Sequence, residues 1–261
     1  AVLNEKIEEN GQGMLLRDVE IPLSVVLSSM ELYGFAVDRE GIEEFSVMLE
    51  NRINRLITEI YDYAGCTFNI NSPKQLGEIL FEKLLLPAKK KTKTGYSTSA
   101  EILEGLVDVH PIIPDILEYR TLTKLKSTYC DGLLKVIGAD GRIHSTFTQT
   151  ETRTGRLSST EPNLQNIPVR SELGREMRKF FKAEDGYVLC DADYSQIELR
   201  VLADIANDKN MIDAFNNGDD IHAITASQVF KMPMDMVTPL MRSRAKAVNF
   251  GIVYGIGAFS L

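Results

Sequence analysis

Two spacings of apolar residues divide this sequence, and their order along the chain limits the folds that it can adopt. Before Gly141 the apolar residues recur at helical spacing. From Gly141 to Thr150 they alternate with polar residues, as in a strand, and beyond Asp193 the helical spacing returns. Because helical and strand-like segments are segregated in this way, the order predicts an α+β protein with an inserted helical module.

Residues that favour helix ends mark where the helices begin and stop. Glycines directly after apolar helical patterns predict C-terminal ends, and hydroxyl or acidic residues directly before such patterns predict N-caps. The predicted C-terminal glycines are Gly34, Gly65 and Gly255, and the predicted N-caps are Asp38, Ser72, Thr98 and Thr238. A long helix is also expected after Pro111 and Pro114, and polar turn residues are expected across "SSTEPNLQNIP".

Composition and charge narrow the class of protein. No apolar run approaches the ~20 residues that span a bilayer, and the three cysteines form no CxxC pair, so we expect a cytoplasmic protein without a membrane segment. The net charge is −8, yet residues 120–182 carry a net +6 and residues 183–235 a net −8. This unevenness indicates a basic face beside an acidic one, although chance clustering of charges on solvated surfaces would give the same count.

The stretch "YVLCDADYSQIE" holds the first candidate site. Residues 187–193 are expected to form a strand, in which Asp191 and Asp193 face the same way. A carboxylate at a strand end can bind a divalent cation, although an ordinary turn aspartate is the alternative. Ser195 and Glu198 have the spacing of a capping box, so they are expected to begin the next helix.

The last helix carries the second candidate site. Arg242, Lys246, Phe250 and Tyr254 lie four residues apart and form one slowly turning stripe, with two cations followed by two aromatic rings. Such a stripe suits a ligand with phosphates at one end and a flat ring at the other. The alternative is a pair of core aromatic residues beneath basic side chains that reach out to solvent.

These segments together resemble the family A DNA polymerases. "DADYSQIELR" and "RSRAKAVNFGIVYG" are similar to two active-site motifs of that family, "TGRLSSTEPNLQNIPVR" to its minor-groove segment, and "FNINSPKQLGEILFEKLLLP" and "YRTLTKLKSTY" to its thumb. The similarity extends over roughly residues 18–261. It implies a partial right-hand fold: an incomplete palm with an antiparallel sheet, a helical thumb and part of the helical fingers.

The resemblance also implies domain bounds. Residues 1–20 would be a stub of a preceding nuclease-like domain, and residues 21–37 would be the helix that leads into the palm. The thumb would cover residues 38–140, the first part of the palm residues 141–197, and the fingers residues 198–261.

For the chemistry, the resemblance implies a role for each matching residue. Asp193, with the backbone carbonyl of Tyr194, would bind Mg²⁺. The nucleotide would be bound by Gln196, Glu198, His222, Arg242, Lys246, Phe250 and Tyr254. Of these, Arg242, Lys246 and His222 would hold the triphosphate. Phe250 would stack near the sugar and base, Tyr254 would lie at the templating position, and Glu198 would select deoxynucleotides.

The resemblance assigns the primer–template DNA to a further set: Lys124, Arg156, Asn163, Gln165 and Asn166. The lysine run "KKKTK" at residues 89–93 would bind backbone phosphates, unless it is only a solvated loop. The parent activity would be DNA synthesis from dNTPs, in replication and repair within the bacterial cytoplasm.

One element of the family pattern is missing. The family carries a second metal-binding acid in a His-Asp-Glu motif, and none of the three histidines here begins such a motif. We therefore expect the isolated chain to be inactive, with an unpaired sheet edge open to self-association. Two alternatives are a non-catalytic nucleic-acid-binding module and a fragment of a single-subunit RNA polymerase. Glu198 and the thumb segments favour the DNA polymerase.

Overall fold

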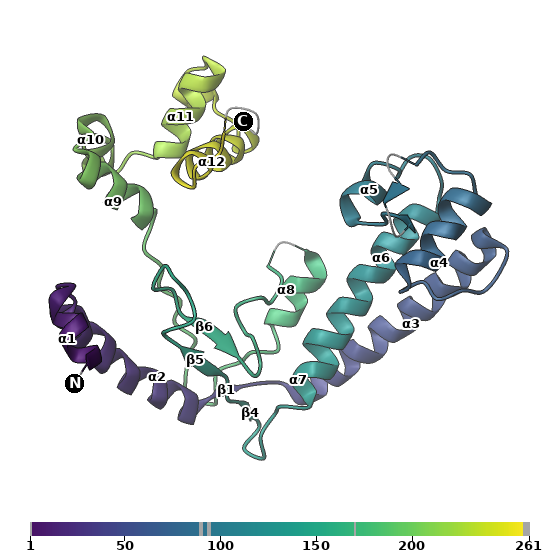
Figure 1. The fold of residues 1–261 in the computed structure, drawn as a ribbon, viewed down its shortest axis with the longest axis horizontal. Helices are drawn as coiled ribbons and strands as arrows, with labels where there is room; N and C mark the ends of the chain where they lie inside the picture. The colour runs from purple at the N-terminus through teal and green to yellow at the C-terminus, as the bar shows by residue number, and fades with distance from the viewer. Residues whose placement is uncertain (1, 89–90, 93–94, 170, 258–261) are drawn as a thin grey trace. The chain divides into compact units, whose positions relative to one another are not determined.

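The computed structural model describes residues 2–88, 91–92, 95–169 and 171–257, which form two compact units, Ala1–Leu189 and Cys190–Leu261. Helices dominate both, and three two-stranded antiparallel sheets lie in the first unit (Figure 1). The predicted α+β class is therefore confirmed. The division between the units falls inside the segment predicted as palm, whose bounds remain a prediction.

The first unit begins with helices α1 (Val2–Glu9), η1 (Leu15–Glu20, a π-helix) and α2 (Ile21–Tyr33). As predicted, α2 ends at Gly34, where φ is +66°. Strand β1 (Phe35–Ala36) follows and pairs with β4 (Arg142–Ile143).

Helix α3 (Arg39–Ala64) supports the main core. The Asp38 carboxylate accepts a hydrogen bond from the Gly41 amide at 3.4 Å, and Gly65 ends α3 in the left-handed conformation, so both predicted ends are confirmed. Helix α6 (Ile112–Lys124) lies along α3 and continues through the π-helix η3 (Leu125–Asp131) into α7 (Gly132–Leu134) (Figure 1). The fully buried residues between them include Ile42, Leu49, Ile60, Ile112, Ile116 and Leu122.

Shorter elements cover one end of this helix pair: α4 (Pro73–Gly77), the π-helix η2 (Glu78–Lys83), the hairpin β2 (Lys91–Thr92) and β3 (Gly95–Tyr96), and α5 (Ala100–Glu104). Ser72 caps α4 as predicted, accepting from the Gln75 amide at 3.4 Å. In the lysine run, residues 89, 90 and 93 lie outside the described residues.

The predicted N-cap at Thr98 is wrong, because α5 begins one residue later, after Ser99. Thr98 is buried, and its hydroxyl accepts a hydrogen bond from the Arg120 guanidinium at 3.2 Å. The tertiary contact with α6 therefore occupies the side chain that the local pattern assigned to a cap.

The strand-like segment after Gly141 is confirmed, as β4 and β5 (Thr146–Thr148). A third strand, β6 (Ser158–Thr160), pairs with β5 where polar turn residues were expected. The Ser159 side chain is fully buried, and its hydroxyl bonds that of Ser145 at 2.7 Å. Because buried hydroxyls replace apolar residues here, hydrophobic alternation gave no indication of this strand. Helix α8 (Glu172–Arg178) follows, capped by Ser171.

The predicted strand over residues 187–193 is wrong. These residues have no regular secondary structure, and Tyr187, Val188 and Leu189 are 67%, 87% and 58% exposed. A strand needs a neighbour for its backbone hydrogen bonds, and none of the strands among the described residues pairs with this segment. The apolar run is strand-like in composition only.

The second unit is helical: α9 (Ile197–Ala206), α10 (Lys209–Asn217), α11 (Ile221–Phe230), the short 3₁₀ helix η4 (Met234–Met236) and α12 (Pro239–Val253). A small core joins Leu199, Ala214 and Ile221. Thr238 caps α12 through the Met241 amide at 3.3 Å, and Gly255 follows its end, as predicted. No helix among the described residues has the length and apolar character that crossing a bilayer requires.

Candidate nucleotide and nucleic-acid interface

The start of α11 is joined to α12 through Asp220. One oxygen of the Asp220 carboxylate caps α11, accepting from the backbone amides of His222 (3.0 Å) and Ala223 (3.3 Å). The other oxygen accepts a hydrogen bond from Nε of Arg242. Burial alone would raise the pKa of the Asp220 carboxyl, but these donors outweigh it and hold the pKa below its usual value. Asp220 thus stays ionised and fixes the Arg242 guanidinium beside His222.

His222 is 1% exposed and lies between α11 and α12. Its Nδ1 lies 3.0 Å from the Asn249 side-chain amide nitrogen, which also donates to the Thr225 hydroxyl at 3.1 Å. Burial lowers the pKa of His222, helped by the nearby charges of Arg242 and Lys246 and opposed by Asp220. The ring is therefore neutral near pH 7, and the amide at Nδ1 leaves its proton on Nε2.

The predicted stripe on α12 is contiguous in the structure. The Lys246 ammonium lies 5.9 Å from the centre of the Phe250 ring, and the Phe250 and Tyr254 rings stack with centroids 6.2 Å apart at 17°. His222 meets Phe250 at 5.8 Å. Tyr254 is 65% exposed and Phe250 is half-buried, so the two rings do not form a core pair.

The predicted capping box is wrong. Helix α9 begins at Ile197, after Gln196 in a left-handed conformation (φ +55°), so Ser195 lies too early to cap it. Glu198 instead accepts a hydrogen bond from the Tyr254 hydroxyl at 2.6 Å. This contact brings the acid to the aromatic end of the stripe. The side-chain oxygen of Gln196 is shielded from solvent and has no hydrogen-bond partner among the described residues.

Asp191, Asp193 and Tyr194 are exposed, in the irregular segment before α9. Within the described residues, no group of three or more histidine, cysteine, aspartate or glutamate side chains is arranged to hold a metal ion. The Asp193 carboxylate and the Tyr194 carbonyl supply oxygen ligands of the kind that Mg²⁺ prefers. In enzymes this ion often takes one or two carboxylates and completes its shell with phosphates and water. The donor chemistry fits Mg²⁺ in that shared form.

Three of the predicted DNA-binding residues line one groove in the first unit. A groove of about 440 Å³ is bounded by Lys124, Thr128, Tyr129 and Leu133 on the helical side and by Pro162, Asn163 and Asn166 on the other. Lys124, Asn163 and Asn166 are exposed. The structure thus brings Lys124 together with Asn163 and Asn166, which lie 39 and 42 positions after it in sequence.

Gln165 lies between Asn163 and Asn166 in the loop after β6, and Arg156 lies in the loop before β6. The Gln165 amide donates to the Asn163 side chain at 3.0 Å, and the Gln165 side chain donates to the Leu157 carbonyl at 3.2 Å. The Arg156 carbonyl accepts from the Thr152 hydroxyl at 2.6 Å. Neither residue lines the groove itself.

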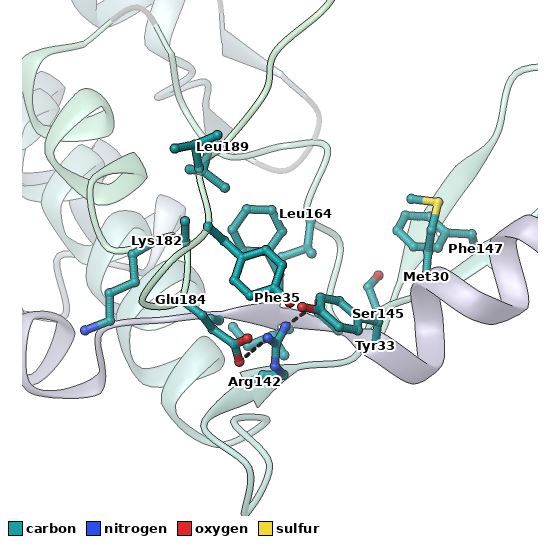
Figure 2. A pocket seen from close by; sticks show the side chains of 16 residues that line it. Met30, Tyr33, Phe35, Arg142, Ser145, Phe147, Leu164, Lys182, Glu184 and Leu189 are labelled. Carbon is teal, nitrogen blue, oxygen red and sulfur yellow. Dashed lines mark hydrogen bonds and ion pairs between the residues drawn. The ribbon is translucent and has the colours of Figure 1, made fainter.

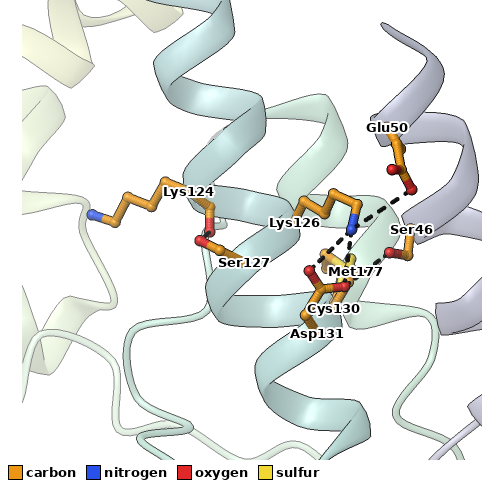
Figure 3. A network of polar contacts seen from close by, with 8 residues as sticks. All are labelled: Ser46, Glu50, Lys124, Lys126, Ser127, Cys130, Asp131 and Met177. Atoms are coloured by element: carbon orange, nitrogen blue, oxygen red, sulfur yellow. Dashed lines mark hydrogen bonds and ion pairs between the residues drawn. The ribbon is translucent and has the colours of Figure 1, made fainter. Parts of the chain in front are cut away.

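A polar network fixes the helical side of the groove to α3. Lys126 lies 3.0 Å from the Asp131 carboxylate, which also accepts from the Ser46 hydroxyl of α3 at 3.1 Å. Although burial favours the protonated acid, these two donors lower the pKa of Asp131. Figure 3 shows the Lys124 side chain leaving the helix on the side away from this network, and Lys124 is exposed. Beneath the network, burial raises the pKa of the Cys130 thiol to about 12.

An apolar pocket of about 320 Å³ lies elsewhere in the first unit (Figure 2). The Arg142 guanidinium stacks on the Tyr33 ring at 4.2 Å beside it and pairs with Glu184. The pocket contains none of the predicted site residues, so we assign it no part in the site.

Asp220 and Asn249 are site residues that the sequence reasoning missed. Asp220 could have been found as the N-cap of the helix that begins with Ile221 and His222. Asn249 lies three residues after Lys246 on α12, and no pattern in the sequence indicates that its amide meets a histidine of another helix.

Comparison with known proteins places these residues in context. A model of DNA polymerase family A matches residues 39–261. The DNA polymerase I of Caldicellulosiruptor bescii is 57% identical over 256 residues, which are 98% of this chain and 30% of that protein. The DNA polymerase I of Bacillus subtilis is 52% identical over 261 residues, 99% of this chain and 30% of that protein. The chain thus spans about 30% of the length of these curated relatives.

A solved structure matches as well. It is the POL domain of Pol1 from M. smegmatis in complex with DNA primer-template and dNTP, with a TM-score of 0.90 and 43% identity. The match covers 99% of this chain and 46% of that chain.

Proposed function

Since this chain belongs to DNA polymerase family A, we propose that it carries the nucleotide-binding helix and the duplex-binding groove of a template-directed DNA polymerase. The observation that carries the proposal is the continuous array on α11 and α12. It runs from Asp220 and Arg242 through His222 and Lys246 to Phe250 and Tyr254. The relatives named above are DNA polymerases, which favours this function over that of an RNA polymerase.

The array suits a nucleoside triphosphate. Arg242 and Lys246 place two cations on the first half of α12, where the helix dipole also attracts phosphate. Neutral His222 is proposed to donate to a phosphate oxygen without adding charge, and because its ring is 1% exposed here, this contact requires the ring to become accessible when the nucleotide binds. Phe250 offers a ring face to the sugar and base, and Tyr254 lies at the template side of that ring. Glu198, on α9, borders the aromatic end of the array, and Gln196, which precedes α9, is proposed to bind the nucleotide through its buried side-chain oxygen.

Glu198 is proposed to select the sugar. Its carboxylate is fixed by the Tyr254 hydroxyl, one helical turn beyond Phe250. A ribose 2′-hydroxyl pressed against this carboxylate and its stem would lose hydration without gaining a good partner, which costs ~1–3 kcal/mol.

Asp193, with the Tyr194 carbonyl, is proposed to hold Mg²⁺ together with the triphosphate. The ion would neutralise phosphate charge and assist attack by the primer 3′-hydroxyl. We further propose that this chain alone does not extend primers, because none of its three histidines begins the His-Asp-Glu motif that carries the family's second metal-binding acid. Sustained extension by contaminant-free protein would contradict this.

The groove in the first unit is proposed to hold the primer–template. Lys124 would contact a backbone phosphate. The side chains of Asn163, Gln165, Asn166 and Arg156 would contact base or sugar edges. Minor-groove acceptors are nearly the same at every base pair, so such contacts follow pair geometry without reading sequence.

The proposal is tested first by nucleotide binding to this chain. We expect Arg242→Ala and Lys246→Ala each to weaken dNTP binding about 10-fold in titrations with Mg²⁺, because each removes a charge-assisted contact to phosphate. Lys209→Ala, which removes an exposed lysine of the same unit outside the array, is the matched control. Equal dNTP affinity in all three variants and the wild type would contradict the proposal. The remaining candidate would then be a non-catalytic DNA-binding module, which the groove also supports.

Two broader proposals follow from the family, and a third from an exposed apolar segment. The parent protein would act in DNA replication and repair, and the bacterial relatives favour a cytoplasmic location. Self-association was expected through an unpaired sheet edge; because residues 187–193 form no strand, it is proposed instead through the exposed apolar segment Tyr187–Leu189. Sedimentation velocity over a range of concentrations tests this last proposal.

A further inference from the structure

We infer that Tyr129 is a positioning residue for DNA binding: its hydroxyl holds the loop that carries Asn163 and Asn166 against the helix that carries Lys124. The inference rests on the proposed function, because it concerns how the groove keeps its shape for a duplex. Tyr129 carries no charge with which to bind the duplex. It acts through its hydrogen bond to the backbone of Asn166.

The location of Tyr129 suits this role. It lies in the π-helix η3, is 6% exposed, and its ring packs in the main core. Its hydroxyl reaches the wall of the groove and donates a hydrogen bond to the Asn166 carbonyl. Because the packed ring of Tyr129 has little freedom to move, its hydroxyl is held in a fixed position.

The helical wall is itself held in place. One side of the helix lines the groove, through Lys124, Thr128, Tyr129 and Leu133. The opposite side of the helix is bonded to α3 through Lys126, Asp131 and Ser46 (Figure 3). These bonds oppose movement of the helix relative to α3. The hydrogen bond from Tyr129 to Asn166 therefore attaches the loop to a helix that is itself fixed.

The loop wall is fixed at its other end by different bonds. The Ser145 hydroxyl donates to the Pro162 carbonyl at 2.8 Å, and the Ser159 hydroxyl accepts from the Leu164 amide at 3.1 Å. These bonds tie residues 162–164 to the sheet of β5 and β6. Tyr129 ties residue 166 to the helix, so the loop is held between the two.

Loss of the hydroxyl should leave the ring packed but free the Asn166 carbonyl. Residues 165–167 would then sample positions away from Lys124, and the amide side chains would no longer meet the duplex together with the lysine. Because the charge of Lys124 is unchanged, the ionic part of binding should persist while the non-ionic part weakens.

The test compares Tyr129→Phe with Tyr61→Phe. Tyr61 is a matched control, since its hydroxyl also donates to a backbone carbonyl, that of Phe68, at 2.9 Å and away from the groove. In fluorescence anisotropy with a primer–template duplex, we expect Tyr129→Phe to bind about 5-fold more weakly, with an unchanged slope of log affinity against log salt. Tyr61→Phe should bind as the wild type does. Hydrogen exchange of the amides of residues 165–167, measured without DNA, should become faster in Tyr129→Phe only.

A double-mutant cycle with Asn166→Ala tests whether Tyr129 acts through the loop. In the Asn166→Ala background, Tyr129→Phe should weaken binding less than it does in the wild type. Wild-type affinity in Tyr129→Phe, strictly additive losses in the cycle, or equal losses in Tyr61→Phe would each overturn the inference. If the wild-type chain fails to bind duplex DNA, the proposed function fails too. If it binds and Lys124→Ala weakens it while Tyr129→Phe does not, the inference alone fails.

Discussion

At the scale of single residues, His144 joins two elements through both nitrogens of its ring. Nδ1 lies 2.7 Å from the Glu31 carbonyl at the end of α2, and Nε2 lies 2.9 Å from the Asp140 carboxylate. Both partners are acceptors, so the contacts favour the doubly protonated ring. The Glu31 carbonyl, followed by Asp140, raises the pKa of His144, against the opposing effects of burial and Arg142.

This raised pKa predicts a pH-dependent stability. A histidine whose folded pKa exceeds its unfolded value of 6.5 stabilises the fold fully below that value and loses the contribution as pH rises through the folded pKa. We therefore expect the melting temperature of the wild type to exceed that of His144→Gln at pH 6, and the difference to shrink toward pH 8. A difference that is constant or grows with pH would contradict the assignment.

Gly34 gives a second prediction at this scale. Its φ is +66°, and a Cβ built there would lie 2.7 Å from the His144 ring and 2.9 Å from the Ile143 carbonyl oxygen. Gly141 is the control, with φ +75° and no atom within 4 Å of such a Cβ. Gly141→Ala should cost ~1–2 kcal/mol of backbone strain. Gly34→Ala should cost clearly more, because Gly34 with ψ −173° lies in a region essentially open to glycine only and because its Cβ would clash, as measured by urea unfolding. Equal losses in the two variants would contradict this prediction.

At the scale of elements, most local signals were reliable and the non-local ones were not; the local exceptions are the caps expected at Thr98 and Ser195. The caps at Asp38, Ser72 and Thr238 were predictable because a cap depends on three or four adjacent residues. The strand expected over residues 187–193 failed because a strand requires a partner that its own sequence does not specify.

The same difference between local and non-local signals holds for the candidate site. Periodicity alone placed the stripe of α12 on one face, because helical spacing is a local property. The contact between Glu198 and Tyr254 joins residues 56 positions apart, and the capping-box pattern pointed to a different role for the acid. Likewise, a positive φ at Gln196 is set by tertiary structure rather than by residue type.

The cap of α12 supplies the prediction at this scale. Thr238→Ala should destabilise the start of the helix by ~1 kcal/mol, since the Met241 amide loses its acceptor. Because Arg242 follows in the first turn, dNTP binding should weaken as well. Ser99→Ala is the control, since Ser99 precedes α5 without a side-chain capping hydrogen bond and its substitution should change stability little. Thermal melting and dNTP titration of both variants provide the measurement, and equal effects would contradict the prediction.

At the scale of the whole molecule, the charge distribution matters more than its sum. The net charge of −8 would repel DNA, yet residues 120–182 carry +6 and include Lys124 and Arg156. Local fields decide binding at distances near the Debye length of ~10 Å, so a basic segment can hold a polyanion on an acidic protein.

We therefore predict weak, sequence-independent duplex binding that falls with salt. Each phosphate contact should contribute about −0.9 to the slope of log affinity against log salt, so Lys124→Ala should make the slope shallower by about that amount. Lys74→Ala, at the start of α4 and outside the groove, should leave it unchanged. Binding that ignores salt, or that strongly prefers one sequence, would count against the proposed interface.

The three thiols of this chain differ in a way that an experimenter can use. Cys130 is buried in the core. Cys66 in the first unit and Cys190 in the second are exposed. Maleimide dyes should therefore label the native protein at two sites without any engineered cysteine, since the buried thiol remains protonated and unreactive. Energy transfer between a donor and an acceptor at these positions would measure the separation of the units in solution, and its change when duplex DNA or a nucleotide is added.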